Sequence, residues 1–166
     1  MNFEIIEIEE LSGRAATIYT VLLSGSEQTV FDNFLEENKE RFKNEIKFIV
    51  NRLYEIGHRV GAREGFFKPN EGKPGDGVCA LYDLPDSKLR LYCIRYGNVA
   101  IILGGGGEKP KSMRAWQESE KLSEETSRMI QVSEAITARL KSGDIEWSRD
   151  GSALEGDLNF GEDENY

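Results

Sequence analysis

The sequence has few of the residues on which metal enzymes, membrane proteins and disulfide-stabilised domains depend. Its 166 residues include one histidine, His58, and two cysteines, Cys79 and Cys93. The cysteines follow no CxxC spacing and have no histidine beside them, which argues against a metal site. Both lie in apolar stretches, where we expect two buried free thiols. No window approaches the roughly 18 apolar residues of a membrane-spanning helix.

The N-terminal stretch lacks the features of a secretory signal. "MNFEIIEIEEL" is acidic, with no basic head and no small-residue cleavage site. We therefore expect a cytoplasmic protein. Its length is that of one globular domain, which can bury a single core without disulfides or metals.

The four consecutive glycines Gly104–Gly107 do not form a known nucleotide-binding motif. A phosphate-binding loop needs two glycines five positions apart, followed by lysine and then serine or threonine. A dinucleotide fingerprint needs a helix promptly after the strand. The run meets neither requirement, so we expect a strand exit, where missing side chains let the chain turn sharply into the last helix.

The net charge of −9 conceals an uneven distribution. Residues 1–40 carry −7 and residues 116–166 carry −8, whereas residues 41–115 hold 14 basic and 8 acidic side chains and carry +6. A basic middle with acidic flanks is typical of a nucleic-acid-binding patch that the flanks shield. Ordinary solvated surfaces would give the same counts.

The first half of the chain predicts two strands and a helical region. "NFEIIEIEEL" and "AATIYTVLLSG" have the alternation and β-branched content of strands, and we expect them to pair as a hairpin. Ser24 and Glu27 have capping-box spacing, which predicts a helix start near Glu27. An apolar stripe over 30–56 has a hitch near residues 38–39, which fits two helices or one kinked helix. Gly57 and Gly61 should end it.

The second half predicts three strands, a helix and a tail. "VCALYDLP", "SKLRLYCIRY" and "VAIILG" are strand candidates, the last two joined by a "GN" turn. In the middle strand, alternation puts Leu91 and Cys93 on one face and Arg90 and Tyr92 on the other, so one face can be core and the other functional. A helix is expected over 115–141.

The expected fold is a single α+β domain over residues 1–143, an antiparallel sheet covered on one face by helices. It has an N-terminal strand, a helical hairpin and a C-terminal helix. Residues 144–166 form an acidic tail with 8 acidic side chains and one arginine. They predict a hairpin around residues 150–151, a strand on a neighbour, or a loose tail.

The basic middle interleaves cations with aromatic residues, as RNA-binding surfaces do. Cations hold phosphates, aromatic rings stack on unpaired bases, and a cation beside a scissile phosphate stabilises the charge that forms when a 2′-hydroxyl attacks. The same residues are expected equally if the aromatic rings pack the sheet and the lysines only keep the loop soluble. The candidate RNA-binding residues are Arg63, Lys68, Lys73, Lys88, Tyr92, Arg95 and Lys111.

The order of elements, together with "YDLPDSKLRLYCIRYGNVAIILGGGGEKP", resembles the RelE/ParE toxin superfamily, in particular its HigB-like, phage Gp49-like branch. The resemblance covers about residues 14–141 and rests on "CALYD", "LRLYCI" and "ILGGGGEKPK". It implies a RelE-like fold and metal-independent, cofactor-free cleavage of messenger RNA on the ribosome. Arg90 would contact the scissile phosphate, and Lys109 would take the place of a terminal lysine that also serves catalysis.

The resemblance also implies partners. These are a cognate antitoxin protein, the ribosome and its message, with a homodimer possible and no membrane. Gly105–Glu108 stand where the branch has histidine, glycine, phenylalanine and lysine. An alternative function is therefore a non-catalytic protein of the same fold that holds a protein partner. The charge partition further predicts that the acidic tail folds over the basic face.

Overall fold

The computed structural model describes residues 1–81, 86–110 and 119–161. The helices are α1 (Val30–Asn38), α2 (Lys43–Glu55) and α3 (Glu120–Ser142), with a π-helical turn η1 (Ile56–Val60) and a 3-10 turn η2 (Glu64–Phe66) after α2. The strands are β1 (Phe3–Glu7), β2 (Thr17–Leu23), β3 (Phe67–Lys68), β4 (Val78–Leu81), β5 (Leu89–Tyr96), β6 (Ala100–Glu108), β7 (Ile145–Trp147), β8 (Leu154–Gly156) and β9 (Asn159–Phe160).

The main sheet runs in the order β3-β4-β5-β6-β2-β1-β9. Neighbouring strands are antiparallel except β2 and β6, which run parallel from the Thr17–Ala100 pair to the Thr20–Leu103 pair. The chain is therefore an α+β protein with a mostly antiparallel sheet. The predicted β1–β2 hairpin is confirmed, and so are the three consecutive strands β4, β5 and β6.

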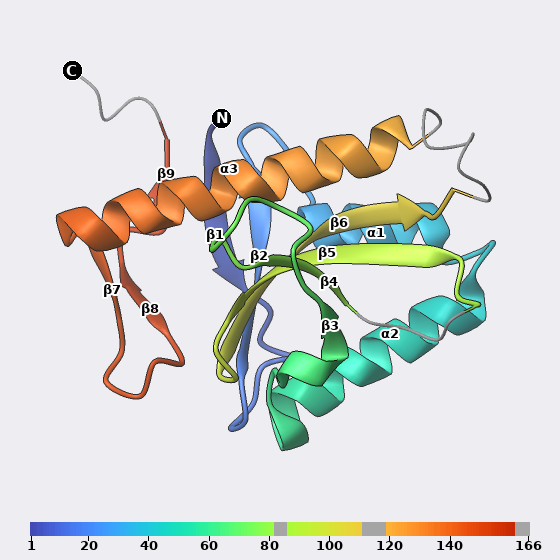
Figure 1. The fold of residues 1–166 in the computed structure, drawn as a ribbon, viewed down its shortest axis with the longest axis horizontal. Coiled ribbons are helices and arrows are strands. Elements are labelled where there is room, and N and C mark those ends of the chain that lie inside the picture. The colour runs from blue at the N-terminus through green and yellow to red at the C-terminus, as the bar shows by residue number, and fades with distance from the viewer. Residues whose placement is uncertain (82–85, 111–118, 162–166) are drawn as a thin grey trace.

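Helices cover both faces of the sheet, not one (Figure 1). Leu91 and Cys93 belong to the core under α1 and α2, while Tyr92 and Ile94 belong to the core under α3. The predicted alternation along β5 is therefore confirmed. The prediction that helices cover only one face of the sheet is wrong. Tyr92 and Ile94 are apolar enough to bury under α3, and each large buried side chain contributes roughly 1.5–3 kcal/mol.

The first helix begins at Val30, three residues after the predicted start. The Thr29 hydroxyl accepts a hydrogen bond from the Asp32 backbone N–H at 3.1 Å, and the Asp32 carboxylate accepts one from the Thr29 N–H at 3.3 Å. This pair is the actual capping box. The predicted box at Ser24 and Glu27 is wrong, because Ser24 belongs to the turn that closes β2.

The hitch in the apolar stripe is a break between two helices, since α1 ends at Asn38 and α2 begins at Lys43. Of the two glycines expected to end this region, only Gly61 does so, with φ of +81°. Gly57 lies inside η1, where a Cβ atom would collide with the carbonyl oxygen of Leu11. It allows close backbone approach rather than helix termination.

The glycine run lies inside strand β6 and is not a strand exit. β6 continues to Glu108, and Gly104 and Gly105 together face the single residue Tyr92 of β5, which makes a β-bulge. A Cβ on Gly104 would meet the Met129 side chain, and one on Gly105 would meet the Glu125 carboxylate. The glycines thus allow α3 to pack directly on the strand backbone.

The tail joins the domain as far as it is described. β7 and β8 form a hairpin, with Gly151 in its turn at φ of +77°, and β9 pairs with β1. The Phe160 ring stacks on Phe3 with centroids 4.6 Å apart. Both structured alternatives therefore occur, and residues 144–161 are continuous with the domain. β9 lies at the edge of the main sheet opposite β3, which carries Lys68, while Trp147 of β7 contacts Tyr96 at the end of β5.

Some expectations fall outside the described residues. These are Lys111, the end of the strand predicted over 78–85, the first residues of the helix predicted over 115–141, and residues 162–166 of the tail. Within the described ranges, no helix combines the length and apolar character that crossing a membrane requires.

Candidate functional site

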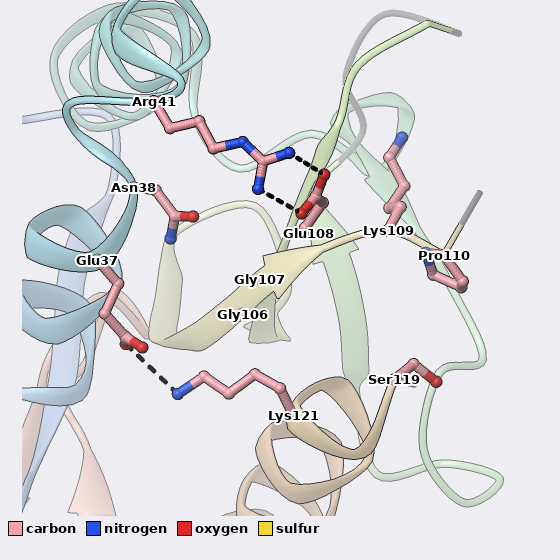
Figure 2. A pocket seen from close by; sticks show the side chains of 10 residues that line it. All are labelled: Glu37, Asn38, Arg41, Gly106, Gly107, Glu108, Lys109, Pro110, Ser119 and Lys121. Carbon is pink, nitrogen blue, oxygen red and sulfur yellow. Dashed lines mark hydrogen bonds and ion pairs between the residues drawn. The ribbon is translucent and has the colours of Figure 1, made fainter. Parts of the chain in front are cut away.

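A hollow of about 510 Å³ lies where the end of α1, the glycine segment of β6 and the start of α3 meet (Figure 2). We call it the glycine-strand pocket. β2 pairs with β6 only as far as Leu103, and beyond that residue the ladder of β6 is with β5 alone among the described strands. The glycines contribute no side chains, so part of the pocket wall is backbone. The lining residues are Glu37, Asn38, Arg41, Gly106, Gly107, Glu108, Lys109, Pro110, Ser119 and Lys121.

Ion pairs cross this pocket. The Arg41 guanidinium donates to both carboxylate oxygens of Glu108, at 3.1 and 3.2 Å. The Lys121 ammonium lies 3.4 Å from a carboxylate oxygen of Glu37, so it links α3 to α1 (Figure 2). Both pairs are partly exposed, so each stabilises the fold by no more than about 1 kcal/mol. They order the pocket wall more than they stabilise the protein.

A buried carboxylate lies directly beside the glycine segment. The Glu125 side chain is 5% exposed and fills the space that a side chain on Gly105 would need. Arg128 donates to it at 2.6 Å, and the Lys121 ammonium lies 3.3 Å away. Burial alone lowers the pKa of Lys121, but Glu125 and Glu37 outweigh that effect and hold the pKa above its usual value. Lys121 is therefore a fixed cation.

Three of the predicted site residues lie together beside the pocket, at the end of β5 and β6. Arg90 faces Gly107 across the ladder, and the Lys109 N–H donates to the Lys88 carbonyl at 2.7 Å. Because side chains alternate along a strand, Lys109 lies on the same face as Gly107 and diagonally from Arg90. We call Lys88, Arg90 and Lys109 the glycine-end group.

Within this group the two residues assigned to chemistry have different surroundings. The Lys109 ammonium donates to the Ser87 hydroxyl at 2.7 Å, which fixes its direction. Arg90 is partly exposed, and its guanidinium makes no hydrogen bond or ion pair with the described part of the chain. Gly107 opposite it has no side chain, and the Lys121 and Leu122 side chains of α3 lie 3.3 and 3.6 Å from where its Cβ would be. Among the described residues none uses the Arg90 donors, so the guanidinium could donate to an anionic ligand.

The other predicted cations that the structure describes lie near η2 and the β3–β4 loop. Arg95, the one of them on β5, is five residues from Arg90, which is about 17 Å along the strand. We call Arg63, Lys68, Lys73 and Arg95 the loop group. The Arg95 guanidinium donates to the Ala62 carbonyl at 2.7 Å and to the Asn98 side chain at 2.6 Å. Lys73 pairs with Glu134 on α3 at 2.9 Å, and this hydrogen bond raises the pKa of Lys73.

The other two members of the loop group also bind groups of neighbouring segments. The Arg63 guanidinium donates to the Val60 carbonyl at 3.0 Å, and Lys68 lies 3.6 Å from a Glu71 carboxylate oxygen. Tyr92, predicted to stack on RNA bases, is 3% exposed in the core under α3, so its ring is not available for stacking. The predicted site residues within the described ranges form two separate groups and one buried ring.

Sequence reasoning missed Arg41 and Lys121 as pocket residues. Arg41 meets Glu108, which is 67 positions further along the chain, and Lys121 meets Glu37 at a separation of 84. No local pattern relates residues so far apart in the sequence. Each of these two contacts exists only once the helices have packed around β6.

No family model, curated protein or solved structure matches the chain. Fold and site geometry must therefore support any assignment of function.

Proposed function

We propose that this chain has a RelE-like fold and is the toxin component of a type II toxin–antitoxin module, an endoribonuclease that cleaves message on the ribosome. The order β2, α1, α2, β4, β5, β6 supports the proposal, because it is the expected strand, helical hairpin and three-strand run. The cognate antitoxin would be its protein partner.

The observation that carries the proposal is the proximity of Arg90 and Lys109. These two residues, which the resemblance assigns to chemistry, come from different strands and lie diagonally on one face of the β5–β6 ladder. The Arg90 guanidinium makes no hydrogen bond or ion pair with the described part of the chain, and the glycine-strand pocket adjoins both residues through Gly107 and Lys109. A phosphodiester could meet two cations there.

In the proposed reaction a ribose 2′-hydroxyl attacks the neighbouring phosphorus, and the bond from phosphorus to the 5′-oxygen of the next nucleotide breaks. Negative charge builds on the phosphate oxygens in the transition state. A planar guanidinium can donate two parallel hydrogen bonds to those oxygens, and an ammonium adds a point charge. We assign the first role to Arg90 and the second to Lys109.

The test is an assay with purified chain and translating ribosomes, in which primer extension maps breaks in the message. We expect cleavage of translated message and none of the same RNA without ribosomes. Intact message, at protein concentrations that saturate the ribosomes, would contradict the proposal.

A second function, a non-catalytic protein that holds a partner, is favoured by the ion pairs. Arg41 and Lys121, which line the glycine-strand pocket, are already paired with Glu108 and Glu37. The face of β5 that carries Arg90 is covered by α3 over Tyr92 and Ile94. These two cations of the pocket are therefore less available to RNA phosphates than unpaired ones would be.

The two functions differ in what the chain does to translation. The non-catalytic protein would leave translation and message intact at any concentration. It would still bind the product of an adjacent short gene, which calorimetry with the purified pair would measure. Ribosome binding with message cleavage would reject this second function.

A further inference from the structure

The two cysteines, 14 positions apart in the sequence, lie directly opposite each other on β4 and β5. Their sulfur atoms are 3.8 Å apart, and the Cys79 thiol also donates to the Cys93 carbonyl at 3.6 Å. Directly opposed residues in an antiparallel pair have Cα atoms about 4.5–5.5 Å apart. A disulfide accepts roughly 4.4–6.8 Å. The backbone is thus already in place for a bond between them.

The pair is buried, but Cys79 adjoins a surface hollow. A pocket of about 290 Å³ in the β3–β4 loop region has Cys79 in its wall, together with Arg95 and Lys73. The pairing of β3 with β4 ends at Ala80, so at Cys79 the strand β4 is the edge of the sheet among the described strands. A small reagent can reach Cys79 from this side after a local opening.

The two thiols differ in their surroundings. Cys93 lies on β5 between two strands and is fully buried, and the hydrogen bond with Cys79 and the burial together raise its pKa well above the usual value. Cys79 lies at the pocket wall and is 4% exposed. This asymmetry makes Cys79 the sulfur that an oxidant meets first and Cys93 the sulfur that completes the bond.

We propose that Cys79 and Cys93 are a redox modification site, a dithiol that a hydroperoxide oxidises to an intramolecular disulfide between β4 and β5. This inference does not depend on the proposed function.

The chemistry balances with the hydroperoxide as the oxidant. The Cys79 thiolate attacks one peroxide oxygen, the O–O bond breaks, and Cys79 becomes a sulfenic acid with release of hydroxide. The Cys93 sulfur then attacks the Cys79 sulfur, and the S–O bond breaks with loss of water. For hydrogen peroxide, two thiols and one peroxide give one disulfide and two waters. A dithiol reductant reverses the modification by thiol–disulfide exchange.

The disulfide would close the loop from Cys79 to Cys93, which contains Lys88 and Arg90. It would join β4 to β5 covalently, next to the edge of the sheet where β3 has only two residues. Loop closure restricts the unfolded chain, so the oxidised protein should resist urea better than the reduced protein.

The test uses the native chain with hydrogen peroxide, followed by catalase and alkylation of remaining thiols under denaturing conditions. Peptide mapping should find Cys79 joined to Cys93, with a mass about 2 Da below the two free thiols. We expect no alkylated thiol, a monomer throughout, and formation at least tenfold faster than global unfolding. Two thiols that remain alkylatable, a reaction no faster than unfolding, or disulfide-linked dimers only would overturn the proposal.

The single variants test the order of attack. Cys93→Ser should give a Cys79 sulfenic acid that a dimedone probe traps, whereas Cys79→Ser should give little trapped product over the same time. Equal trapping in both variants would overturn the assigned order. If either variant unfolds, as judged by circular dichroism, the alkylation result on the unmodified sequence still decides whether the disulfide forms.

Discussion

Arg90 and Arg95 lie five residues apart on β5 and belong to two groups of cations that are bound to the protein in different ways. Arg95 is held by the Ala62 carbonyl, which follows η1, and by the Asn98 side chain in the turn after β5. Arg90 points to the other face, opposite a glycine, and has no side-chain partner within the described ranges. The comparison shows that cations of equal charge differ in whether the described part of the fold already uses their donors.

The largest effect is a loss of stability, expected at Gly106, the glycine of β6 that lies closest to the backbone of β5. In Gly106→Ala the new Cβ would collide with the Arg90 carbonyl oxygen, a backbone atom that cannot move without breaking the β5–β6 ladder. We expect a loss of at least about 3 kcal/mol in the free energy of unfolding, measured by urea denaturation. In the matched control, Gly107→Ala, the Cβ meets side chains and no backbone atom, Lys121 at 3.3 Å and Leu122 at 3.6 Å, and the loss should be below about 1 kcal/mol. Equal losses in the two variants would show that close contact with the β5 backbone is not the reason for glycine at position 106.

The next largest effect concerns catalysis under the proposed function. Arg90→Ala should lower the rate of message cleavage on translating ribosomes about 100-fold, because one charge-stabilising donor is removed from the transition state. Arg149→Ala removes an exposed arginine of the β7–β8 hairpin and should leave the rate unchanged. A cleavage rate unaffected by Arg90→Ala would remove the functional distinction between the two groups.

Substitutions in the loop group should change the stability of the protein instead of the rate of message cleavage. Arg95→Ala leaves the buried Ala62 carbonyl without its guanidinium donor, and we expect a loss of about 2 kcal/mol in the free energy of unfolding. Arg90→Ala should change it by less than about 0.5 kcal/mol. Thermal or urea denaturation of both variants measures the difference. The reverse ranking would exchange the roles assigned to the two arginines.

The smallest effect is expected at Lys73, the most exposed member of the loop group with an ion pair. Lys73→Gln should not measurably change the urea midpoint at pH 7, because its pair with Glu134 is in solvent. The Glu134 hydrogen bond raises the pKa of Lys73 above 10.5, so any stabilisation is complete below pH 10.5 and is lost as pH rises through the raised value. An NMR titration of the ammonium checks the direction. Loss of the proton below pH 10.5 would contradict it.

Local sequence patterns predicted most of the elements. The alternation along Leu89–Tyr96 gave the correct two faces, because strand alternation acts between neighbours in sequence. The turn at Gly97 and Asn98 was predicted at the right place, but it has three residues and not two, since Tyr96 pairs with Ala100. The same kind of reasoning erred at the glycine run. Glycine is common at strand ends and in bulges alike, and only Met129 and Glu125 of α3 explain why Gly104 and Gly105 must lack side chains.

The candidate site was predicted in part. Lys88, Arg90 and Lys109 are brought together as neighbours on one ladder, whereas Tyr92 was misread because burial under α3 depends on a helix 28 residues further along the chain. The ion pairs of Arg41 and Lys121 and the Cys79–Cys93 contact were beyond prediction for the same reason. Each joins residues that no repeat or spacing relates.

By itself the sequence determined the kind of element at most positions, the basic middle and the absence of a phosphate-loop motif, since these follow from neighbouring residues and composition. Only the tertiary structure decided which cations have partners among the described residues, that both faces of β5 are covered, and that the glycine run is a bulged strand under α3. The physical reason is packing. A helix docked on the backbone of β6 fixes which side chains find partners, and Gly104 and Gly105 are where that docking is closest.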